Sequence, residues 1–111
     1  MSQNISAFDS SIGGTRTANG ITAAALINPR RCTLNSMHVV APGTSGTLTI
    51  NDAASLDGAN ESNIIFSHDF SDLTAGQLIP LQWPVQSGIV VSAVPTGGSI
   101  NLAFTFGPYG A

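Results

Sequence analysis

The sequence predicts an all-β protein, an antiparallel, jelly-roll-like β-sandwich of about seven to eight strands with a flexible N-terminal arm. Three observations lead to this class. Short segments with alternating apolar residues recur along the chain, turn residues separate them at roughly eight- to twelve-residue spacing, and helical periodicity is missing. A chain of 111 residues fits one domain. We therefore expect an arm at 1–20 and a single sandwich domain at 21–111.

The arm is predicted from a polar stretch in which Ile5 and Phe8 are isolated apolar residues. One interpretation is a disordered terminus. The other is a segment that orders on a neighbouring subunit, with Ile5 and Phe8 as anchors and main-chain hydrogen bonds to a sheet edge. The sequence leaves both interpretations open.

Seven segments are predicted to be strands. The first is rich in alanine, which also suits a helix, but Pro29 and the short length of the segment count against one. In TLTIN the alternation is regular, and Leu48 and Ile50 share one face. The predicted strands are 20–27, 31–41, 47–51, 63–70, 77–85, 88–94 and 99–106.

The later strands carry more specific predictions. Pro80 and Pro84 cannot donate to a ladder, so the strand that contains them is expected at a sheet edge. The segment 95–98 (PTGG) is short enough to join the last two strands as a hairpin. Strand 63–70 is expected to place Ile64, Phe66, His68 and Phe70 on one face. The last strand is expected to turn Ile100, Leu102, Phe104 and Phe106 inward.

The composition is unusually poor in charge. Charged residues make up 8% of the chain, against about 25% in a typical domain. Lysine is absent, and the cations are Arg16, Arg30 and Arg31. A surface built from Ser, Thr, Asn, Gln and Gly lacks the charge that keeps monomers apart. We infer that other subunits cover much of it.

Several function classes do not fit this composition. Three arginines among six acidic residues cannot form the basic stripe that nucleic acid or a membrane surface requires. The first 20 residues do not have the pattern of a signal peptide. Cys32 cannot form an intrachain disulfide, and we expect it to be a small buried residue.

No catalytic or cofactor site is predicted. His68 and Asp69 are neighbours on a strand and point to opposite faces, and His38 has no evident partner, so we expect no enzyme activity. The loop 52–62 gathers three acidic residues, yet it does not match a calcium loop, and a solvated acidic loop is the favoured interpretation. Those residues are Asp52, Asp57 and Glu61.

Carbohydrate binding is the main alternative that the residues permit. Exposed aromatic side chains beside Asn, Asp or Gln are typical of β-sandwiches that bind sugars. Trp83, between prolines, and Tyr109, in the tail, are the candidates. The favoured interpretation of Trp83 is a core or interface residue at the edge of the sandwich.

From Arg31 to Asp52 the chain has an arginine pair, a strand ending MHVV, the turn PGTSG and the segment GTLTIND. This pattern, with a later segment from Pro84 to Phe106, resembles small virion proteins of tailed bacteriophages. The resemblance covers roughly 30–106, and it departs from the common pattern at Asn51 and in the longer loop 52–62. It implies a jelly-roll-like structural module, either a head decoration (cement) protein or a head-fibre or tail component.

The combined prediction is a non-enzymatic virion structural protein, assembled in the bacterial cytoplasm, that decorates and stabilises the phage head. Its expected partners are itself, preferably as a trimer, and the major capsid protein or another virion protein. No cofactor, nucleic acid or membrane is expected. The predicted interface residues are Ile5, Phe8, Trp83 and Tyr109. The alternative is a carbohydrate-binding or host-attachment module of a head fibre or tail.

Overall fold

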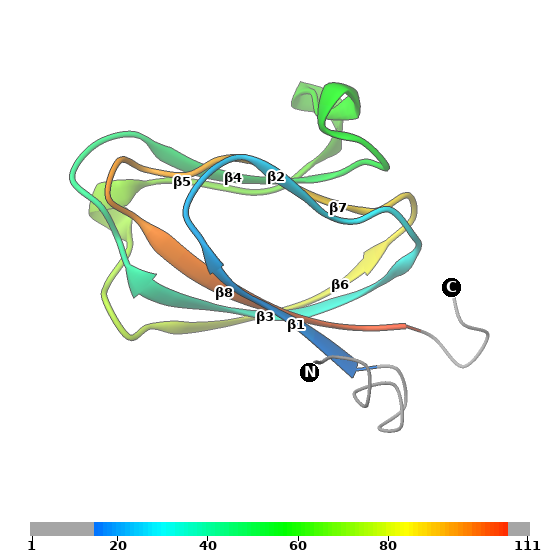
Figure 1. The fold of residues 1–111 in the computed structure, drawn as a ribbon, viewed down its shortest axis with the longest axis horizontal. Coiled ribbons are helices and arrows are strands. Elements are labelled where there is room, and N and C mark those ends of the chain that lie inside the picture. The colour runs from blue at the N-terminus through cyan, green and yellow to red at the C-terminus, as the bar shows by residue number, and fades with distance from the viewer. Residues whose placement is uncertain (1–14, 107–111) are drawn as a thin grey trace.

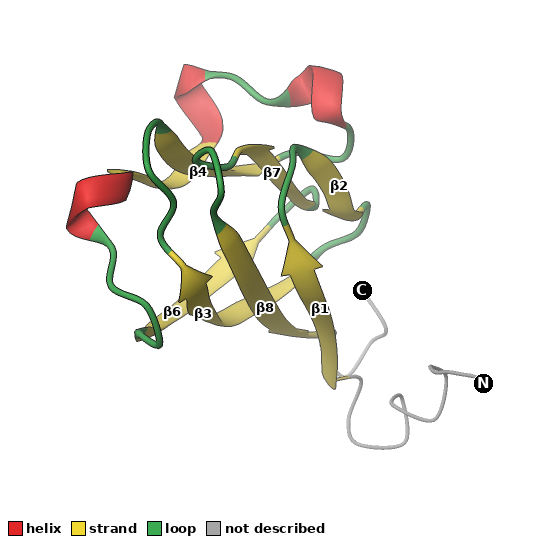
Figure 2. Cartoon of the chain, turned by 60° about the vertical axis from the view of Figure 1, so that its left-hand side comes forward, coloured by secondary structure: helices red, strands yellow, loops and turns green. Residues whose placement is uncertain are grey.

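The chain folds into two sheets that face each other across a common core. The computed structural model describes residues 15–106, which form two antiparallel four-stranded sheets (Figures 1 and 2). The helices in this range are single 3-10 turns of three residues, η2 (Leu56–Gly58), η3 (Glu61–Asn63) and η4 (Phe70–Asp72). No helix of the described range is long and apolar enough to span a bilayer. The predicted all-β class is confirmed.

Each sheet mixes strands from both halves of the chain. Sheet A has the order β1 (Thr15–Ile21), β8 (Ser99–Thr105), β3 (Cys32–Ala41) and β6 (Leu78–Val85). Sheet B has the order β2 (Ala25–Asn28), β7 (Ile89–Ala93), β4 (Thr47–Asp52) and β5 (Ile64–Asp69). The strand with two prolines, β6, lies at an edge of sheet A, as predicted.

The core lies between rows of apolar side chains. Cross-strand partners project to the same face of a sheet, so rows run from strand to strand. In sheet A one row contains Ala18, Leu102, Met37 and Ile79, and the next contains Ile21, Ile100 and Val39. Sheet B contributes Leu48, Ile50, Ile89 and Val91, all with no exposed surface. Burying each such side chain stabilises the fold by roughly 1.5–3 kcal/mol.

The inward positions predicted for the last strand agree with the structure. Ile100, Leu102 and Phe104 are buried in β8. Phe106 follows the end of the strand and packs, half-buried, against the same core. Its ring lies edge-on to Phe104 at 6.0 Å between centroids, and the Arg16 guanidinium lies 5.4 Å from its centroid.

The predicted boundary between arm and domain was wrong for residues 15–20. These residues form most of β1, which pairs with β8 along the edge of sheet A. An edge strand can be stabilised mainly by backbone pairing, so it needs few apolar side chains. The segment TRTANGI therefore resembles a polar linker in sequence, and its main contributions to the core are Ala18 and Ile21. The rest of the predicted arm lies outside the described residues.

The predicted hairpin between the last two strands was also wrong. β7 belongs to sheet B and β8 to sheet A, so the segment 94–98 crosses from one sheet to the other. Both strands bury an apolar face. These faces are buried against each other when the two strands lie in opposite sheets across the core. The alternation in sequence is the same for both arrangements, which explains the error.

Two crossovers run side by side at the left-hand end of Figure 1. The β3–β4 connection and the β7–β8 connection exchange backbone hydrogen bonds: Thr44 N–H donates to the Thr96 carbonyl, and Thr96 N–H donates to the Ser45 carbonyl, both at 2.8 Å. Gly43 makes this close approach possible. Its φ is +89°, and a Cβ there would lie 2.7 Å from the Thr96 carbonyl oxygen.

A β-bulge changes the face of one predicted residue. Consecutive residues of β4, Ile50 and Asn51, pair with Phe66 and Ile64, so Ile65 is an extra residue in β5. Ile64 therefore pairs with Asn51 on the outer face of sheet B and is 41% exposed. The prediction that Ile64 shares a face with Phe66 was wrong for this reason.

The crossover contact gives a stability prediction with a matched control. Gly43→Ala should lower the free energy of unfolding by roughly 2–4 kcal/mol, because it combines a strained φ with a backbone clash. Gly76→Ala should cost only about 1 kcal/mol, since Gly76 has a φ of +83° but no atom within 4 Å of the new Cβ. Urea unfolding of both variants measures the difference. Equal losses would mean that the crossovers are not in close contact.

Candidate functional site

The outer face of sheet A has no charged side chain among the described residues, and we call it the neutral face. Its members alternate along the strands with the buried rows, so they point away from the core. The residues at these positions are mainly small and polar. The surfaces of soluble proteins, by contrast, usually carry charges of both signs. The neutral face consists of Thr17, Thr33, Ser36, His38, Leu78, Pro80, Pro84, Asn101, Ala103 and Thr105.

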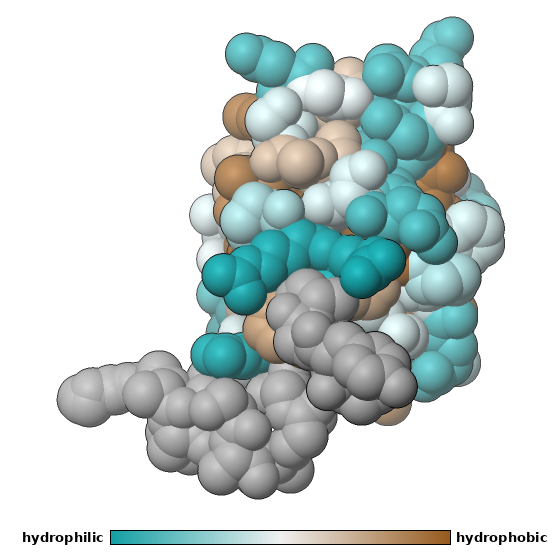
Figure 3. Space-filling model, turned by 90° about the vertical axis from the view of Figure 1, so that its right-hand side faces the viewer, coloured by the Kyte–Doolittle hydropathy of each residue, from teal (hydrophilic) through white to brown (hydrophobic). Residues whose placement is uncertain are grey.

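The described charges do not lie on this face. Arg16, on β1, pairs with the inward-facing Phe104, and its guanidinium lies against the Phe106 ring. The acidic residues lie at the ends of β4 and β5 and in the connections that follow these two strands of sheet B. Arg30 and Arg31 are in the β2–β3 connection, at the right-hand end of Figure 1. Figure 3 shows that end face on, with strongly hydrophilic residues in a band across its middle. The described acidic residues are Asp52, Asp57, Glu61, Asp69 and Asp72.

One margin of the neutral face is apolar and open. Leu78, at the start of β6, is 66% exposed and pairs with His38. Val40, on β3, is 44% exposed and lies two residues beyond His38. The backbone of this corner is fixed, because the N–H of Val39 donates to the Gln77 carbonyl and the N–H of Gly76 donates to the Val39 carbonyl. Leu78 and Val40 therefore present apolar side chains to solvent at a fixed corner of the neutral face.

Asn101 holds His38 in the row of the neutral face that ends at Leu78. The backbone N–H of Gly20 donates to Asn101 Oδ1 at 2.8 Å. That bond orients the amide so that its Nδ2 group lies 3.3 Å from His38 Nδ1 and donates to it. His38, which has no evident partner in the sequence, is thus a hydrogen-bonded residue of the sheet. The pair is a structural contact between β3 and β8.

Trp83 lies on the β6 edge, as predicted, but it faces the core side. It pairs with Leu34, which is fully buried, so both project toward the interior. The edge position still leaves Trp83 44% exposed. Its neighbour Gln82 has a φ of +48° beside a bulge, which twists this edge away from regular pairing. Among the four predicted interface residues, Ile5, Phe8 and Tyr109 lie outside the described residues.

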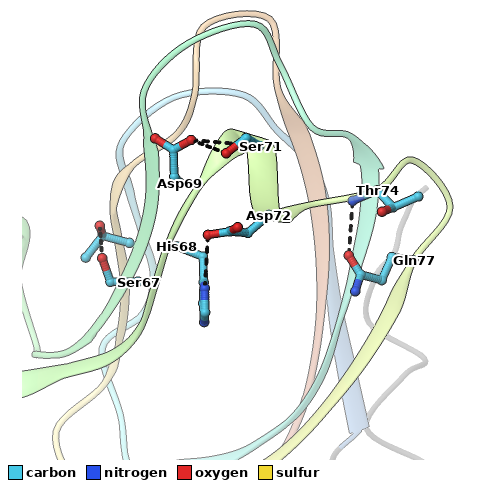
Figure 4. Close-up of polar contacts among 8 residues, drawn as sticks. Ser67, His68, Asp69, Ser71, Asp72, Thr74 and Gln77 are labelled. Carbon is cyan, nitrogen blue, oxygen red and sulfur yellow. Dashed lines mark hydrogen bonds and ion pairs between the residues drawn. The ribbon is translucent and has the colours of Figure 1, made fainter.

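The second histidine belongs to a separate, exposed cluster at η4 (Figure 4). His68 Nδ1 lies 3.7 Å from an Asp72 carboxylate oxygen, and both side chains are more than half exposed. Asp69 projects in another direction and accepts hydrogen bonds from Ser71 (Figure 4). The Ser71 hydroxyl, and then its backbone N–H, lower the pKa of the Asp69 carboxyl. His38 and His68 are on different sheets, so the two histidines do not converge.

Asn51, one of the departures from the phage pattern, is a structural residue whose role the sequence pattern does not reveal. It is 2% exposed, and each polar atom of its side chain is satisfied. Its Nδ2 donates to the Asn60 carbonyl at 3.0 Å and to Asn63 Oδ1 at 2.8 Å, while its Oδ1 accepts from the Ser92 hydroxyl at 2.6 Å. The long loop and Asn51, the two departures from the pattern, are thus one feature: Asn51 holds the loop on sheet B.

The rest of the loop is held by its own polar side chains. Ser55 caps η2, and Asn60 and Asn63 form a capping box around η3. Asn63 Nδ2 also donates to the Gly58 carbonyl at 2.9 Å. Val90, on the outer face of sheet B, is completely buried, and η2 contacts β7. The loop therefore covers sheet B, whereas the neutral face of sheet A has no comparable cover among the described residues.

Removing the Asn51 side-chain bonds should release the loop before it unfolds the domain. Asn51→Ala removes both hydrogen bonds from Asn51 Nδ2 to the loop and leaves the Ser92 hydroxyl without its acceptor, so we expect a loss of about 1–3 kcal/mol. Limited proteolysis should cut the variant within 53–63 while the remaining core stays intact. Ser67→Ala, which removes an exposed hydrogen bond to Thr49 on the same sheet, is the control and should leave the loop resistant. A resistant Asn51→Ala loop would contradict the anchoring role.

The acidic residues of the loop do not converge. Asp52 accepts backbone N–H groups from three consecutive residues, Gln86 (2.9 Å), Ser87 (2.8 Å) and Gly88 (3.3 Å). It thereby fixes the β6–β7 connection. Residues 15–106 contain no group of three or more His, Cys, Asp or Glu placed to hold a metal ion.

Cys32 is buried, as expected, at 5% exposure. Asn28 Nδ2 donates to its Sγ at 3.4 Å. Burial raises the pKa of the Cys32 thiol, and the Asn28 hydrogen bond only partly offsets this. A thiol in this state is a packing residue and a poor nucleophile.

The fold and the surface together define an all-β, two-sheet protein with one uncharged sheet face. No protein family, curated protein or solved structure matches this chain in comparisons of its sequence and fold.

Proposed function

We propose that this chain is a non-enzymatic structural protein that works by assembling into a larger particle. The neutral face carries the proposal. A sheet face of about ten residues without a charge lacks the repulsion that keeps copies of a protein apart. It is also well suited to burial in an interface, because no charged group has to be desolvated. The apolar corner at Leu78 and Val40 adds contact area at the rim of this face.

We also propose that the sandwich is a jelly roll. The strand orders β1-β8-β3-β6 and β2-β7-β4-β5 support it, since two interleaved Greek keys across eight strands produce orders of this kind. Jelly rolls occur in viral capsid proteins and in lectins, so the fold is compatible with assembly and with sugar binding. The choice between them rests on the surface.

The particle that we propose is the head of a tailed bacteriophage, where the chain acts as a decoration protein. The resemblance over roughly 30–106 supports this setting, as does the grouping of the acidic residues on the connections of sheet B, away from the neutral face. The proposed partners are other copies of the chain and the major capsid protein. Many modest contacts would add up through multivalency and stabilise the shell against internal pressure.

Capsid binding tests this function. Purified protein added to phage heads that were assembled without it should bind saturably and raise the temperature at which the heads rupture. The physical reason is that many copies bridge neighbouring subunits. Heads already decorated are the control, since they should take up little more. The proposal fails if binding to undecorated heads is absent or never saturates.

Carbohydrate binding is the second candidate, and the exposure of Trp83 favours it. If Trp83 stacks on sugars, its fluorescence should shift when glycans of the host surface are added, and Trp83→Ala should abolish the binding while circular dichroism stays unchanged. Leu78→Ala, an exposed apolar change on the same strand, is the matched control. A fluorescence signal that does not respond to any surface glycan rules this candidate out.

A further inference from the structure

We propose that the neutral face binds a second copy of this chain through the same face, so that sheet A of one subunit packs against sheet A of another. This inference rests on the proposed function, because it names the partner of that surface. It also assigns an orientation: the loop 53–63 and the acidic connections of sheet B would point outward from the pair.

Charge is the reason for choosing a second copy. The chain carries a net charge of −3, so two copies repel each other in most orientations. Contact through sheet B would bring its five described acidic residues toward those of the partner. Contact through the neutral face opposes Thr, Ser, Ala, Asn, Pro, Leu and His with the same residue types and leaves the described acidic residues on the far sides.

Shape supports the same partner. The inward and outward positions of β1, β8, β3 and β6 alternate, so the outward side chains form aligned rows across four strands. Rows of small residues give a shallow relief, and sheets of this kind pack face to face at about 10 Å. Leu78, on an edge strand, can reach over the margin of the opposing sheet.

The area of the face predicts how tightly the copies associate. Four strands about 4.8 Å apart and about seven residues long cover roughly 20 by 23 Å, or about 450 Å² in plan. Two copies would bury about 900 Å² before side-chain relief is counted, which is below the roughly 1,200–2,000 Å² of stable interfaces and in the range of weak, transient contacts. We therefore expect reversible association that depends on concentration.

Sheet edges offer a competing route, and the structure disfavours two of them. The edge strand β6 carries Pro80 and Pro84 and a bulge at Gln82, all of which hinder pairing with another strand. The edge strand β2 has four residues, and its pairing with β7 is irregular. Pairing of copies through β5 or β1 is left as an outcome that the experiment distinguishes.

The experiment compares two new charges placed at half-buried positions on opposite sides of the molecule. Ala103 lies on the central strand β8 of the neutral face, between Thr17 and Ser36. Ala93 lies on the central strand β7 of sheet B, where it pairs with Thr49 on the outer face. Both alanines are half-buried, so Ala103→Glu and Ala93→Glu are matched in position, burial and chemistry.

Light scattering of the full chain over a concentration series gives the readout. Wild type and Ala93→Glu should form the same oligomer, whereas Ala103→Glu should associate at least about tenfold more weakly, because two like charges would meet in the interface. Leu78→Asp, at a highly exposed position, serves as a second variant that does not threaten folding. Circular dichroism confirms that each variant is folded.

The remaining outcomes each decide the question. A wild-type monomer at all concentrations, or equal association of Ala103→Glu, Leu78→Asp and wild type, overturns the proposal and directs attention to the sheet edges. Dissociation at high salt also overturns it, since that result indicates an ion-paired interface instead of an uncharged one. If the wild type is monomeric but binds capsids saturably, the proposed function stands and this inference fails. If the chain forms an oligomer through the neutral face but does not bind capsids, the inference stands and the proposed function fails.

Discussion

The packing of two apolar sheet faces against each other is the constraint on which the rest of this structure depends. Each strand places alternate residues in the core, and the rows from Ala18 to Ile79 in sheet A meet Leu48, Ile50, Ile89 and Val91 in sheet B. The connections between strands have to keep the apolar faces of both sheets covered, which limits how the chain can pass from strand to strand. Apart from the β4–β5 connection, every connection between described strands crosses from one sheet to the other.

The connections that cross between the sheets are held in place by specific hydrogen bonds. At one end, Gly43 lets the β3–β4 and β7–β8 connections touch and share backbone hydrogen bonds. At the other end, the Asp52 carboxylate gathers the N–H groups of residues 86–88. Among the connections between described strands, the one that stays within a sheet is the long loop after β4, and Asn51 attaches it to the sheet. Polar side chains therefore stabilise the fold mainly through hydrogen bonds to the connections at the ends of the sandwich, and the core between the sheets is apolar.

The two outer faces differ as a consequence. The loop after β4 approaches β7 through η2, and Val90 on the outer face of β7 is fully buried, so part of the outer face of sheet B is covered from within the chain. The outer face of sheet A has no charge and, among the described residues, no cover of that kind. A chain so poor in charge has few ways to keep such a face in solution, and this asymmetry is the physical basis of the assembly role that we propose.

The sequence by itself determined the all-β class, most strand positions, the inward sets of β4 and β8 and the edge position of β6. These follow from alternation with a period of two and from proline, both of which act within a few residues. Only the tertiary structure decided that β7 and β8 lie in different sheets, that TRTANGI is an edge strand, that Ile65 forms a bulge and that Asn51 holds a loop. Trp83 was found at the edge as expected, but its inward direction came from its pairing with Leu34. The neutral face could not be predicted as one surface, because its residues come from four strands whose neighbours are set by long-range pairing, and the same local alternation is compatible with several strand orders.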